Sequence, residues 1–289
     1  MRDLYKAPYQ KFEKLHPQEL RGTEGMKVSL VDWPCNPYGA IATGQSASWR
    51  PWKRNFSANE ILELLSGMAD GTIWPGQAFE AVNFTFAIEN ISRATTHQLV
   101  RIRVGAGFMQ ESGREGKWGG ANFITPLTIL ENSLEHLSFV DDWKHSVKAY
   151  ERKIAYHIPP QDSRFGMGHC VAQNVWMTIN FAALLNWCSK RLCCTVQWEI
   201  NTLARMMRDC VLERFPHLGV LLKSNCERAG GCKSITNFYK PGEENNGNKV
   251  YFPFEGTVCG MVGNYEHHEI EALLDSECDD IEKTHREQF

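Results

Sequence analysis

The chain has 289 residues, 43% of them hydrophobic, which is enough to form one large folded domain without disulfide or metal staples. Its formal net charge of -3 excludes a general electrostatic attraction to nucleic acid or to a membrane surface, so an anionic ligand would need a few well-placed arginines. No uncharged apolar stretch reaches the length of about 18 residues typical of a membrane span, and the first residues do not resemble a signal peptide, so a cytoplasmic protein is expected.

The ten cysteines are expected to be reduced thiols, because no secretory signal is recognised in the sequence. Most of them lie in or near apolar sequence, where buried packing is their usual role. Cys226 and Cys232 would need closer pairing or nearby histidines to bind zinc, so no metal site is predicted.

The first third of the chain predicts strands alternating with helices. Residues 1–25 are polar and irregular and are expected to form an N-terminal arm. A strand is predicted over 26–33 and an amphipathic helix over 58–70. Apolar residues at every second position then predict a half-buried strand; they are Val82, Phe84, Phe86 and Ile88.

Helices dominate the rest of the predicted domain. Ser92 is expected to cap a helix that runs to about Val104, and a glycine-rich loop follows over 105–122. Further helices are predicted over 127–157, 171–191 and 195–213. The helix at 171–191 is apolar almost all round and should be buried. We therefore expect an α+β domain over 26–223, with helices packed on a small mixed or antiparallel sheet, and an irregular C-terminal extension over 224–289.

Residues 94–114, ATTHQLVRIRVGAGFMQESGR, have the composition of a phosphate-binding segment. They place Gln98, Arg101 and Arg103 at a predicted helix end, followed by the glycine-rich loop and then by Ser112-Gly113-Arg114. Phosphate recognition uses guanidinium groups, a hydroxyl and free backbone N–H groups, and this segment offers all three. A solvated basic patch is the alternative interpretation.

Residues 176–200 carry polar side chains within the predicted apolar helix. Asn180 and Asn186 interrupt that helix, and buried amides must be hydrogen-bonded either to neighbouring backbone or to a ligand. Arg191 follows at the helix end, where a buried guanidinium needs an anionic or carbonyl partner. Asn180 and Arg191 would be about 16 Å apart along the axis, so an extended ligand could contact both. An internal polar network is the alternative.

Together, these segments resemble flavin-dependent thymidylate synthases. Residues 79–114 resemble the strand, helix and signature loop of that family, whose signature is Arg-His-Arg, seven residues, Ser, one residue, Arg. A second match, to the family's W-T-x-N…L…R…AQWE segment, involves Trp176, Thr178, Asn180, Leu184, Arg191, Gln197, Trp198 and Glu199. Ser163-Arg164 resembles an Ala-Arg pair that lies between them. The similarity covers roughly residues 26–220, in the same order.

The resemblance implies a reaction, its cofactors and an assembly. A one-carbon unit from methylenetetrahydrofolate would be transferred to C5 of dUMP, with FAD as the cofactor and NADPH as the reductant of the flavin. The family uses no cysteine nucleophile, so none of the thiols needs a catalytic role. The implied assembly is a homotetramer whose sites are shared between subunits.

The resemblance also implies roles for individual residues. FAD would be bound by Arg101, Arg103, Gln110, Asn180, Phe181, Ala182 and Asn186. The nucleotide would be bound by Gln98, Arg101, Gln110, Glu111, Ser112, Gly113, Arg114, Arg164 and Arg191. Arg191 would be the catalytic residue, because a guanidinium beside the pyrimidine carbonyl stabilises the negative charge that develops as C5 becomes nucleophilic.

Departures from the family pattern cluster where the flavin would lie. Ile102 replaces the middle histidine of the signature, and eight residues, VGAGFMQE, separate Arg103 from Ser112. Residues 74–81 lack the histidines expected before the strand, and Thr195-Val196 replace small or polar residues. These changes leave open a specialised relative that methylates or hydroxymethylates C5 of dUMP, UMP or dCMP for modified DNA or nucleoside biosynthesis.

A further alternative is a non-catalytic nucleotide-binding paralogue that has lost flavin, for which Ile102 is the best argument. Against it stand Asn180, Asn186 and Arg191, because idle polar groups in a buried helix would be costly.

Overall fold

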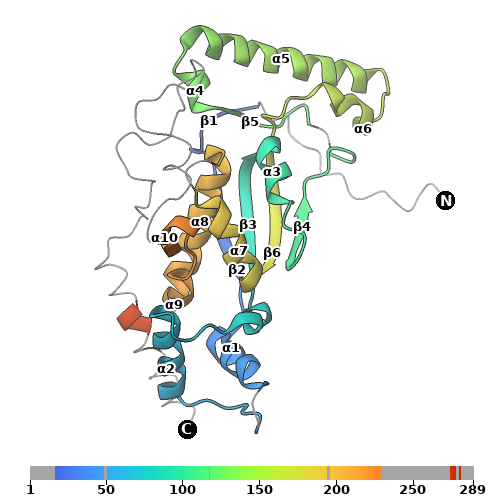
Figure 1. Cartoon of the computed structure of the whole chain (residues 1–289). Coiled ribbons are helices and arrows are strands. Elements are labelled where there is room, and N and C mark those ends of the chain that lie inside the picture. Colours follow the sequence, from blue (N-terminus) through green and yellow to red (C-terminus); the bar gives the residue numbers. More distant parts are fainter. Residues whose placement is uncertain are drawn as a thin grey trace, which may run out of the picture. The chain divides into compact units, whose positions relative to one another are not determined.

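The structure is a computed structural model that describes residues 17–48, 51–116, 118–193, 196–229, 274–277 and 280 (Figure 1). Its main sheet has the strand order β2-β3-β6-β4. These strands are Lys27–Asp32 (β2), Asn83–Ser92 (β3), Ala172–Asn180 (β6) and Ala106–Gln110 (β4). A two-stranded parallel sheet pairs Glu19–Arg21 (β1) with Phe123–Thr125 (β5), with Leu20 opposite Ile124.

Strand β6 runs antiparallel to both of its neighbours, β3 and β4. Backbone hydrogen bonds at the two ends of each strand pair fix these directions. Between β6 and β4, the Glu111 N–H donates to the Asn174 carbonyl at 3.3 Å, and the Asn180 N–H donates to the Gly105 carbonyl at 2.8 Å. Between β6 and β3, the Phe181 N–H donates to the Val82 carbonyl at 2.8 Å, and the Arg93 N–H donates to the Val171 carbonyl at 3.0 Å. Together with the many helices, this arrangement confirms the predicted α+β class.

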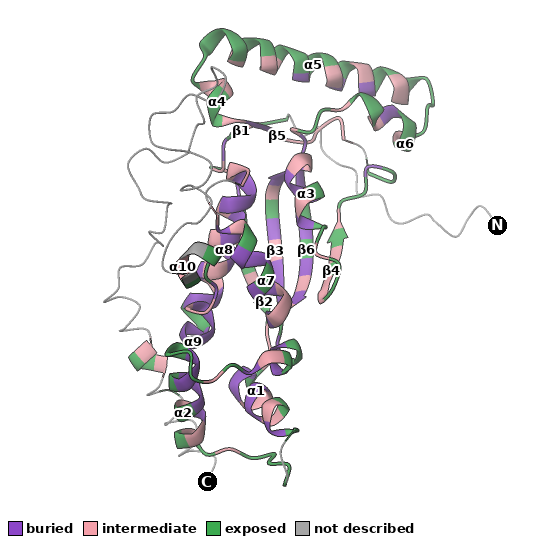
Figure 2. Ribbon diagram, viewed as in Figure 1, coloured by how far each residue is buried: buried purple, intermediate pink, exposed green. Residues whose placement is uncertain are grey.

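The predicted alternation along β3 is confirmed except at Thr85, which is predicted on the polar face but is buried. Phe84, Phe86 and Ile88 are buried, whereas Asn83 and Glu89 are exposed. The same alternation continues on β6, and Figure 2 shows buried residues along both strands and on the helices that follow β6. Because successive side chains of a strand point to opposite faces, the apolar positions form one face of a core.

The helices near the N-terminal end of the chain follow their sequence signals. Helix α1 spans Pro37–Ser46, and α2 spans Ala58–Ala69, close to the predicted 58–70. Ser57 and Glu60 form a capping box at the start of α2, in which each side chain bonds the other's backbone N–H. A 3₁₀ helix, η1 (Gly76–Ala81), leads into β3.

The predicted helix at 171–191 is wrong. Residues 172–180 form strand β6, and only Phe181–Arg191 form a helix, α7. The burial along β6 has a period of two: Val175, Met177 and Ile179 are buried, whereas Trp176 is 47% exposed. A short apolar run is compatible with a buried strand or a buried helix, so its hydrophobicity alone did not distinguish the two.

Three other predicted segments also need correction. The helix after Ser92, α3 (Arg93–Leu99), is capped as predicted, with Thr95 N–H donating to Ser92 Oγ at 3.1 Å, but it ends before Val104. The segment predicted as a glycine-rich loop contains β4. The long helix at 127–157 is two helices, α4 (Leu127–Leu130) and α5 (Ser133–Ala155), because Asn132 accepts bonds from the first turn of α5 and starts a new helix.

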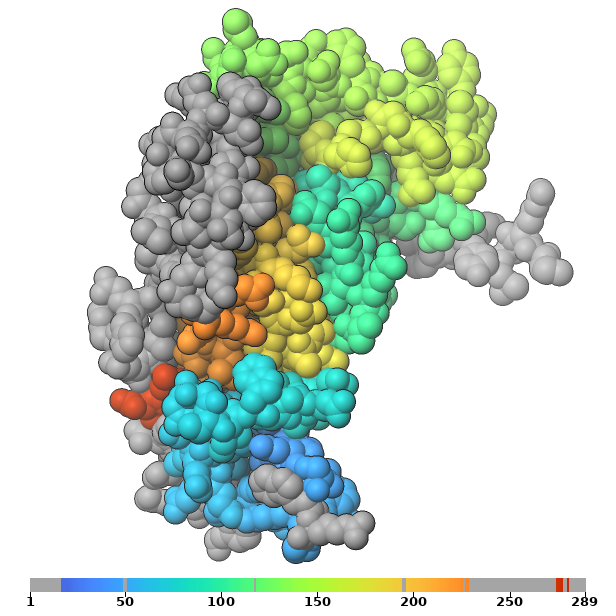
Figure 3. Space-filling model, viewed as in Figure 1, coloured from blue at the N-terminus to red at the C-terminus, as the bar shows by residue number. Residues whose placement is uncertain are grey.

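The remaining elements complete the described chain. Helix α6 (Pro160–Ser163) and the 3₁₀ turn η2 (Arg164–Gly166) precede β6. Helix α8 (Trp198–Arg214) matches the helix predicted at 195–213, and α9 (Pro216–Gly219) and α10 (Asn225–Ala229) follow it. Helix η1 packs against α7, and α2 packs against α9 (Figure 3). No described helix is both long enough and apolar enough to cross a membrane.

The chain divides into two compact units, each built from three segments. One unit comprises 1–26, 89–97 and 110–174, and the other comprises 27–88, 98–109 and 175–289. Strands β3 and β6 contribute residues to both units. Of the predicted N-terminal arm, residues 1–16 lie outside the described residues, and so do 230–273, 278–279 and 281–289 of the predicted C-terminal extension.

Candidate functional site

The predicted site residues fall into two groups, one in each unit. In the unit that contains α7, Gly105 and Asn180 form a tight junction at the entry to β4. Gly105 has a φ of +74°, and its carbonyl accepts from the Asn180 N–H at 2.8 Å. The Asn180 side chain accepts from the Ala183 N–H at 2.8 Å and so caps α7. A Cβ atom at Gly105 would lie 2.6 Å from the Asn180 amide, so only glycine lets the backbone approach this closely.

Two arginines, Arg101 and Arg191, approach each other in this unit. Arg191 is the last residue of α7 and is half-buried. Burial, and to a lesser degree the charge of Arg101, lower the pKa of the Arg191 guanidinium. Within the described chain, no carboxylate forms an ion pair with either guanidinium. Because the guanidinium keeps its proton in proteins, two such groups without an acidic neighbour favour an anion or an electron-rich carbonyl.

Asn180 and Arg191 lie at opposite ends of α7, rather than within one long buried helix as the sequence analysis assumed. An eleven-residue helix still separates their backbones by about 16 Å, so the predicted spacing holds for a different reason. Asn186, predicted to be a buried amide, is exposed on α7, so the argument from the cost of burying it is wrong.

The other predicted residues of this unit differ in exposure. Gln98 and Ala182 are half-buried, and Arg103 is exposed. Phe181 is fully buried, with its ring 5.0 Å from the ring of Phe79, so only its backbone is available to a ligand. The described unit therefore presents guanidinium and amide donors around the Gly105 junction, and it presents Phe181 as part of the core beneath them.

In the other unit, residues 112–116 form a tight turn that the chain itself fixes. Ser112 Oγ accepts from the Arg114 N–H at 3.2 Å, and Ser112 C=O accepts from the Gly116 N–H at 2.8 Å. Gly113 lies so close to Trp118 that a Cβ atom there would be 2.4 Å from the indole. The exposed Arg114 side chain therefore projects from a turn whose backbone has little freedom.

Gln110, the last residue of β4, and Glu111 lead into this turn, and both are held by β6. Asn174 Nδ2 donates to Glu111 Oε1 at 2.9 Å, and Gln110 Nε2 donates to Gln173 Oε1 at 3.2 Å. Gln173 is only 1% exposed, and its own Nε2 donates to the backbone carbonyl of Ala172 at 3.0 Å. The orientation of Gln110 is thus set by a buried amide.

A second arginine pair, Arg93 and Arg164, lies in the same unit. Burial, followed by the charge of Arg164, lowers the pKa of Arg93. Arg164 Nε donates to the Gln161 carbonyl at 3.2 Å. Near them, the His97 and His169 rings meet edge to face at 5.8 Å between centroids. Arg93 was not predicted as a site residue, although its position directly after the capping Ser92 places it at a helix start.

These donors fit the groups that the sequence analysis implied. Guanidinium and amide donors match the diphosphate and the carbonyl-rich ring edge of FAD, and the close approach of the Gly105 backbone to Asn180 and Ala183 fixes the position of the amide donor. No group of three or more His, Cys, Asp or Glu side chains in the described residues is arranged to hold a metal ion.

Comparison with known proteins identifies the family. Residues 40–217 match the family described as thymidylate synthase complementing protein (Thy1). The chain belongs to this family. The Thy1 match includes all of β3, α3, β4, β6, α7 and α8 and thus covers all the predicted site residues. It confirms the resemblance inferred from the sequence.

Relatives of this Thy1 protein include characterised sequences and a solved structure. It is 30% identical over 222 residues to the flavin-dependent thymidylate synthase of Clostridium tetani, covering 69% of this chain and 88% of that protein. It is 33% identical over 162 residues to the corresponding enzyme of Nitratidesulfovibrio vulgaris, covering 53% and 65%.

The crystal structure of the UMP/dUMP methylase PolB from Streptomyces cacaoi, bound with 5-Br dUMP, shares the fold. The TM-score is 0.59 at 19% sequence identity, over 70% of this chain and 96% of PolB. This match confirms the predicted fold of the Thy1 domain.

Proposed function

We propose that the protein transfers a one-carbon unit from methylenetetrahydrofolate to C5 of dUMP, with FAD as its cofactor and NADPH as the reductant. The observation that carries the proposal is the half-buried Arg191 beside Arg101, with no carboxylate of the described chain paired to either. Family membership and the C. tetani relative support the reaction class. We also propose that 26–223 is the catalytic domain, with the arm and the extension outside it.

Arg191 would act on the pyrimidine ring. A partly desolvated guanidinium stabilises negative charge more strongly than one in water, because the surrounding medium screens less. Negative charge develops on the ring carbonyl and N3 as C5 becomes nucleophilic. Arg191 stays cationic despite its lowered pKa and would stabilise that charge in the transition state.

The nucleotide phosphate would be bound by the turn at 112–114 and by the Arg93–Arg164 pair, both in the same unit. The turn supplies backbone N–H groups and the Arg114 guanidinium, which can bind a phosphate through two parallel N–H bonds. The Arg93–Arg164 pair supplies two positive charges close together. Gln98, Gln110 and Glu111 would contact the rest of the nucleotide. Because these contacts act equally in the ground and transition states, they would determine affinity more than rate.

FAD, when bound, would supply the hydride that completes the methyl group. The residues proposed to hold it are Arg101, Arg103, Gln110, Asn180, Ala182, Asn186 and the backbone of Phe181. Asn180 is already committed to capping α7 through its Oδ1, so its amide N–H₂ is the part free to face the cofactor. Ile102 lies in the turn after α3 and supplies no polar contact there.

A second candidate is a specialised relative that methylates or hydroxymethylates C5 of dUMP, UMP or dCMP. The observation that favours it is the fold shared with a UMP/dUMP methylase, because that neighbour accepts both ribose and deoxyribose substrates. Hydroxymethylation would require water, rather than hydride, to capture the exocyclic methylene group. The additional residue between Arg103 and Ser112 would alter the approach of water to that carbon.

A homotetramer with shared sites is also proposed. Exposed apolar side chains support it: on α5, Leu134 is 77% exposed and Leu137 is 67% exposed. On the open face of the sheet, Met109 and Trp176 are exposed as well. Apolar surfaces of this kind often mark contacts with another chain.

The test is one incubation of FAD-loaded protein with methylenetetrahydrofolate, NADPH and equal amounts of dUMP, UMP and dCMP, followed by mass spectrometry. A product heavier than dUMP by one methylene group is expected. A hydroxymethyl product, or modification of another nucleotide, would favour the specialised relative. Protein that stays colourless after FAD is added would instead favour the non-catalytic paralogue.

Two variants separate the proposed roles. Arg191→Ala should abolish turnover and leave FAD bound, and near-normal turnover would contradict its catalytic role. Arg114→Ala should weaken nucleotide affinity with little loss of the maximal rate, because a phosphate contact acts equally in both states. Arg152→Ala, at an exposed position on α5, is the charge-matched control.

A further inference from the structure

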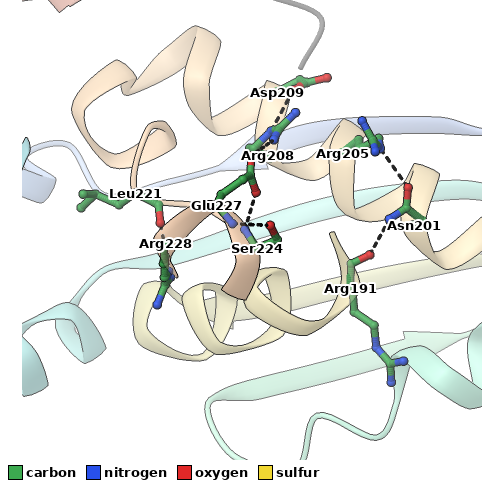
Figure 4. Close-up of polar contacts among 9 residues, drawn as sticks. All are labelled: Arg191, Asn201, Arg205, Arg208, Asp209, Leu221, Ser224, Glu227 and Arg228. Atoms are coloured by element: carbon green, nitrogen blue, oxygen red, sulfur yellow. Dashed lines mark hydrogen bonds and ion pairs between the residues drawn. The ribbon is translucent and has the colours of Figure 1, made fainter. Parts of the chain in front are cut away.

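The C-terminal end of α7, which carries Arg191, is held by a side chain of α8. The last carbonyls of a helix have no partner within the helix and must be satisfied from outside. Asn201 is 3% exposed, and its Nδ2 donates to the Arg191 carbonyl at 2.8 Å and to the Cys193 carbonyl at 3.1 Å (Figure 4). One buried amide group thus closes the end of α7 and fixes the first residues after it.

The orientation of the Asn201 amide is set from its other end. Arg205, one turn further along α8, donates through Nε to Asn201 Oδ1 at 2.9 Å. This bond requires the oxygen to face Arg205 and therefore turns the N–H₂ group toward α7. The amide has no freedom to flip without losing all three bonds. In Figure 4, the Arg191 side chain extends away from this network, so its backbone is held while its guanidinium remains available.

Arg191 needs such an anchor because its guanidinium lies near a like charge. The charge of Arg101 is one of the causes that lower the Arg191 pKa, so the two groups repel each other. Fixing the Arg191 backbone removes one way in which this repulsion could displace the guanidinium. We propose that Asn201 is a positioning residue for Arg191. It holds the C-terminal end of α7 so that the Arg191 guanidinium keeps its position relative to the ligand. The inference rests on the proposed function of Arg191 at the pyrimidine.

A purely structural role for Asn201 predicts a different result. In that case its loss would lower stability and the binding of every ligand together, while the folded fraction kept its turnover number. A positioning role predicts a loss of kcat in fully folded protein with FAD affinity retained. A misplacement of about 1 Å at a reacting group costs on the order of 100-fold in rate, which makes the two cases separable.

The test variant is Asn201→Asp, which keeps nearly the same shape and still accepts from Arg205 but has no donor for the two carbonyls. We expect kcat to fall by roughly 10- to 100-fold, with FAD affinity within about twofold of wild type. Hydrogen exchange should rise in a peptide covering 187–193 and stay unchanged in the middle of α8. Asn59→Asp, which makes the same change at an exposed position in α2, is the matched control and should leave all of these quantities unchanged.

Asn201→Gln keeps both N–H donors and is the second variant, in case the aspartate variant does not fold. It should recover most of kcat and most of the exchange protection at 187–193. The inference is overturned if folded Asn201→Asp keeps kcat within about twofold of wild type, or if folded Asn201→Gln, which retains the donors, loses kcat by about 10-fold or more.

Failure of the proposed function would be visible separately, because wild type itself would then give no methylated product. The exchange measurement and dUMP affinity by calorimetry would still test the inference in that case. Asn201→Asp is expected to raise exchange at 187–193 and to weaken dUMP binding. Unchanged exchange would overturn the inference whatever the activity of the wild type.

Discussion

Replacing Gly105 by alanine tests whether the junction between β4 and α7 is as tight as its geometry indicates. Gly105 has a φ of +74°, and an alanine in the left-handed region costs about 1–2 kcal/mol. Its Cβ would also lie 2.6 Å from Nδ2 and 2.8 Å from Oδ1 of Asn180, and 2.9 Å from Cβ of Ala183. The Asn180 side chain would have to move, and loss of the α7 cap costs about 1 kcal/mol. The expected destabilisation is therefore about 2–3 kcal/mol.

Gly107, two residues further on within β4, provides the control. A Cβ atom there would meet nothing within 4 Å, and its φ lies outside the left-handed region. Gly107→Ala should change the free energy of unfolding by less than about 1 kcal/mol, and in the stabilising direction if the smaller entropy of the unfolded chain dominates. Urea unfolding at 25 °C, followed by circular dichroism, measures both variants against wild type.

A double-mutant cycle separates the two contributions. In an Asn180→Ala background the cap is already lost and the close contact with the amide is gone. Gly105→Ala should then cost only the backbone term of about 1–2 kcal/mol plus the remaining contact with Ala183. The reasoning is refuted if Gly105→Ala is as stable as Gly107→Ala, or if its cost is the same with and without the Asn180 side chain.

Three further predictions concern carboxylates and thiols. Burial would raise the pKa of Glu19, but hydrogen bonds from Thr125 and His136 outweigh burial and lower that pKa below the usual 4.5. The ionised carboxylate therefore stabilises the fold, and this stabilisation is lost as the pH falls below 4.5. In a pH series of urea titrations, the unfolding free energies of wild type and Glu19→Gln should converge over that range. The Glu277 carboxylate accepts from Tyr38 Oη at 2.5 Å and from the His217 backbone N–H at 3.0 Å. Glu277→Gln should therefore lower the free energy of unfolding by about 1–3 kcal/mol. A melting temperature equal to that of Asp275→Asn, the control at an exposed position, would contradict this prediction. Burial raises the pKa of Cys188 to about 12, so iodoacetamide at pH 8 should modify the exposed Cys35 and spare Cys188, as read by peptide mass spectrometry.

The elements that the sequence predicted well are those whose period is unambiguous. Strand β3 alternates apolar and polar residues, and Ser92 is followed by a helix that its hydroxyl caps, so both were readable from local pattern. The run from 171 to 191 was not readable, because a buried strand followed directly by a half-buried helix gives one continuous apolar stretch. Asn180 marks the change, and its capping role was mistaken for a buried polar position within a helix.

The sequence predicted most of the residues that belong to the site but not which of them lie close together. Arg101 and Arg191 were both expected from the sequence, but their mutual approach depends on how β4 and α7 are joined at Gly105. The approach of Arg93 to Arg164 was missed, because it arises from tertiary structure and has no local signal. The anchoring of Arg191 by Asn201 belongs to the same class, since it links two helices across a turn.

The division of the chain into units affects how the protein can be synthesised. The chain passes between the units five times, at 26/27, 88/89, 97/98, 109/110 and 174/175. No contiguous stretch encodes either unit, so neither can be expressed as a fragment or exchanged as a cassette. During synthesis, segment 27–88 cannot complete its unit until the part of that unit beyond residue 174 has been translated. The delay is on the order of ten seconds at ordinary elongation rates. The apolar face of β3 therefore stays uncovered until β6 and α7 have been synthesised, and a strand exposed in this way is prone to pair with other chains.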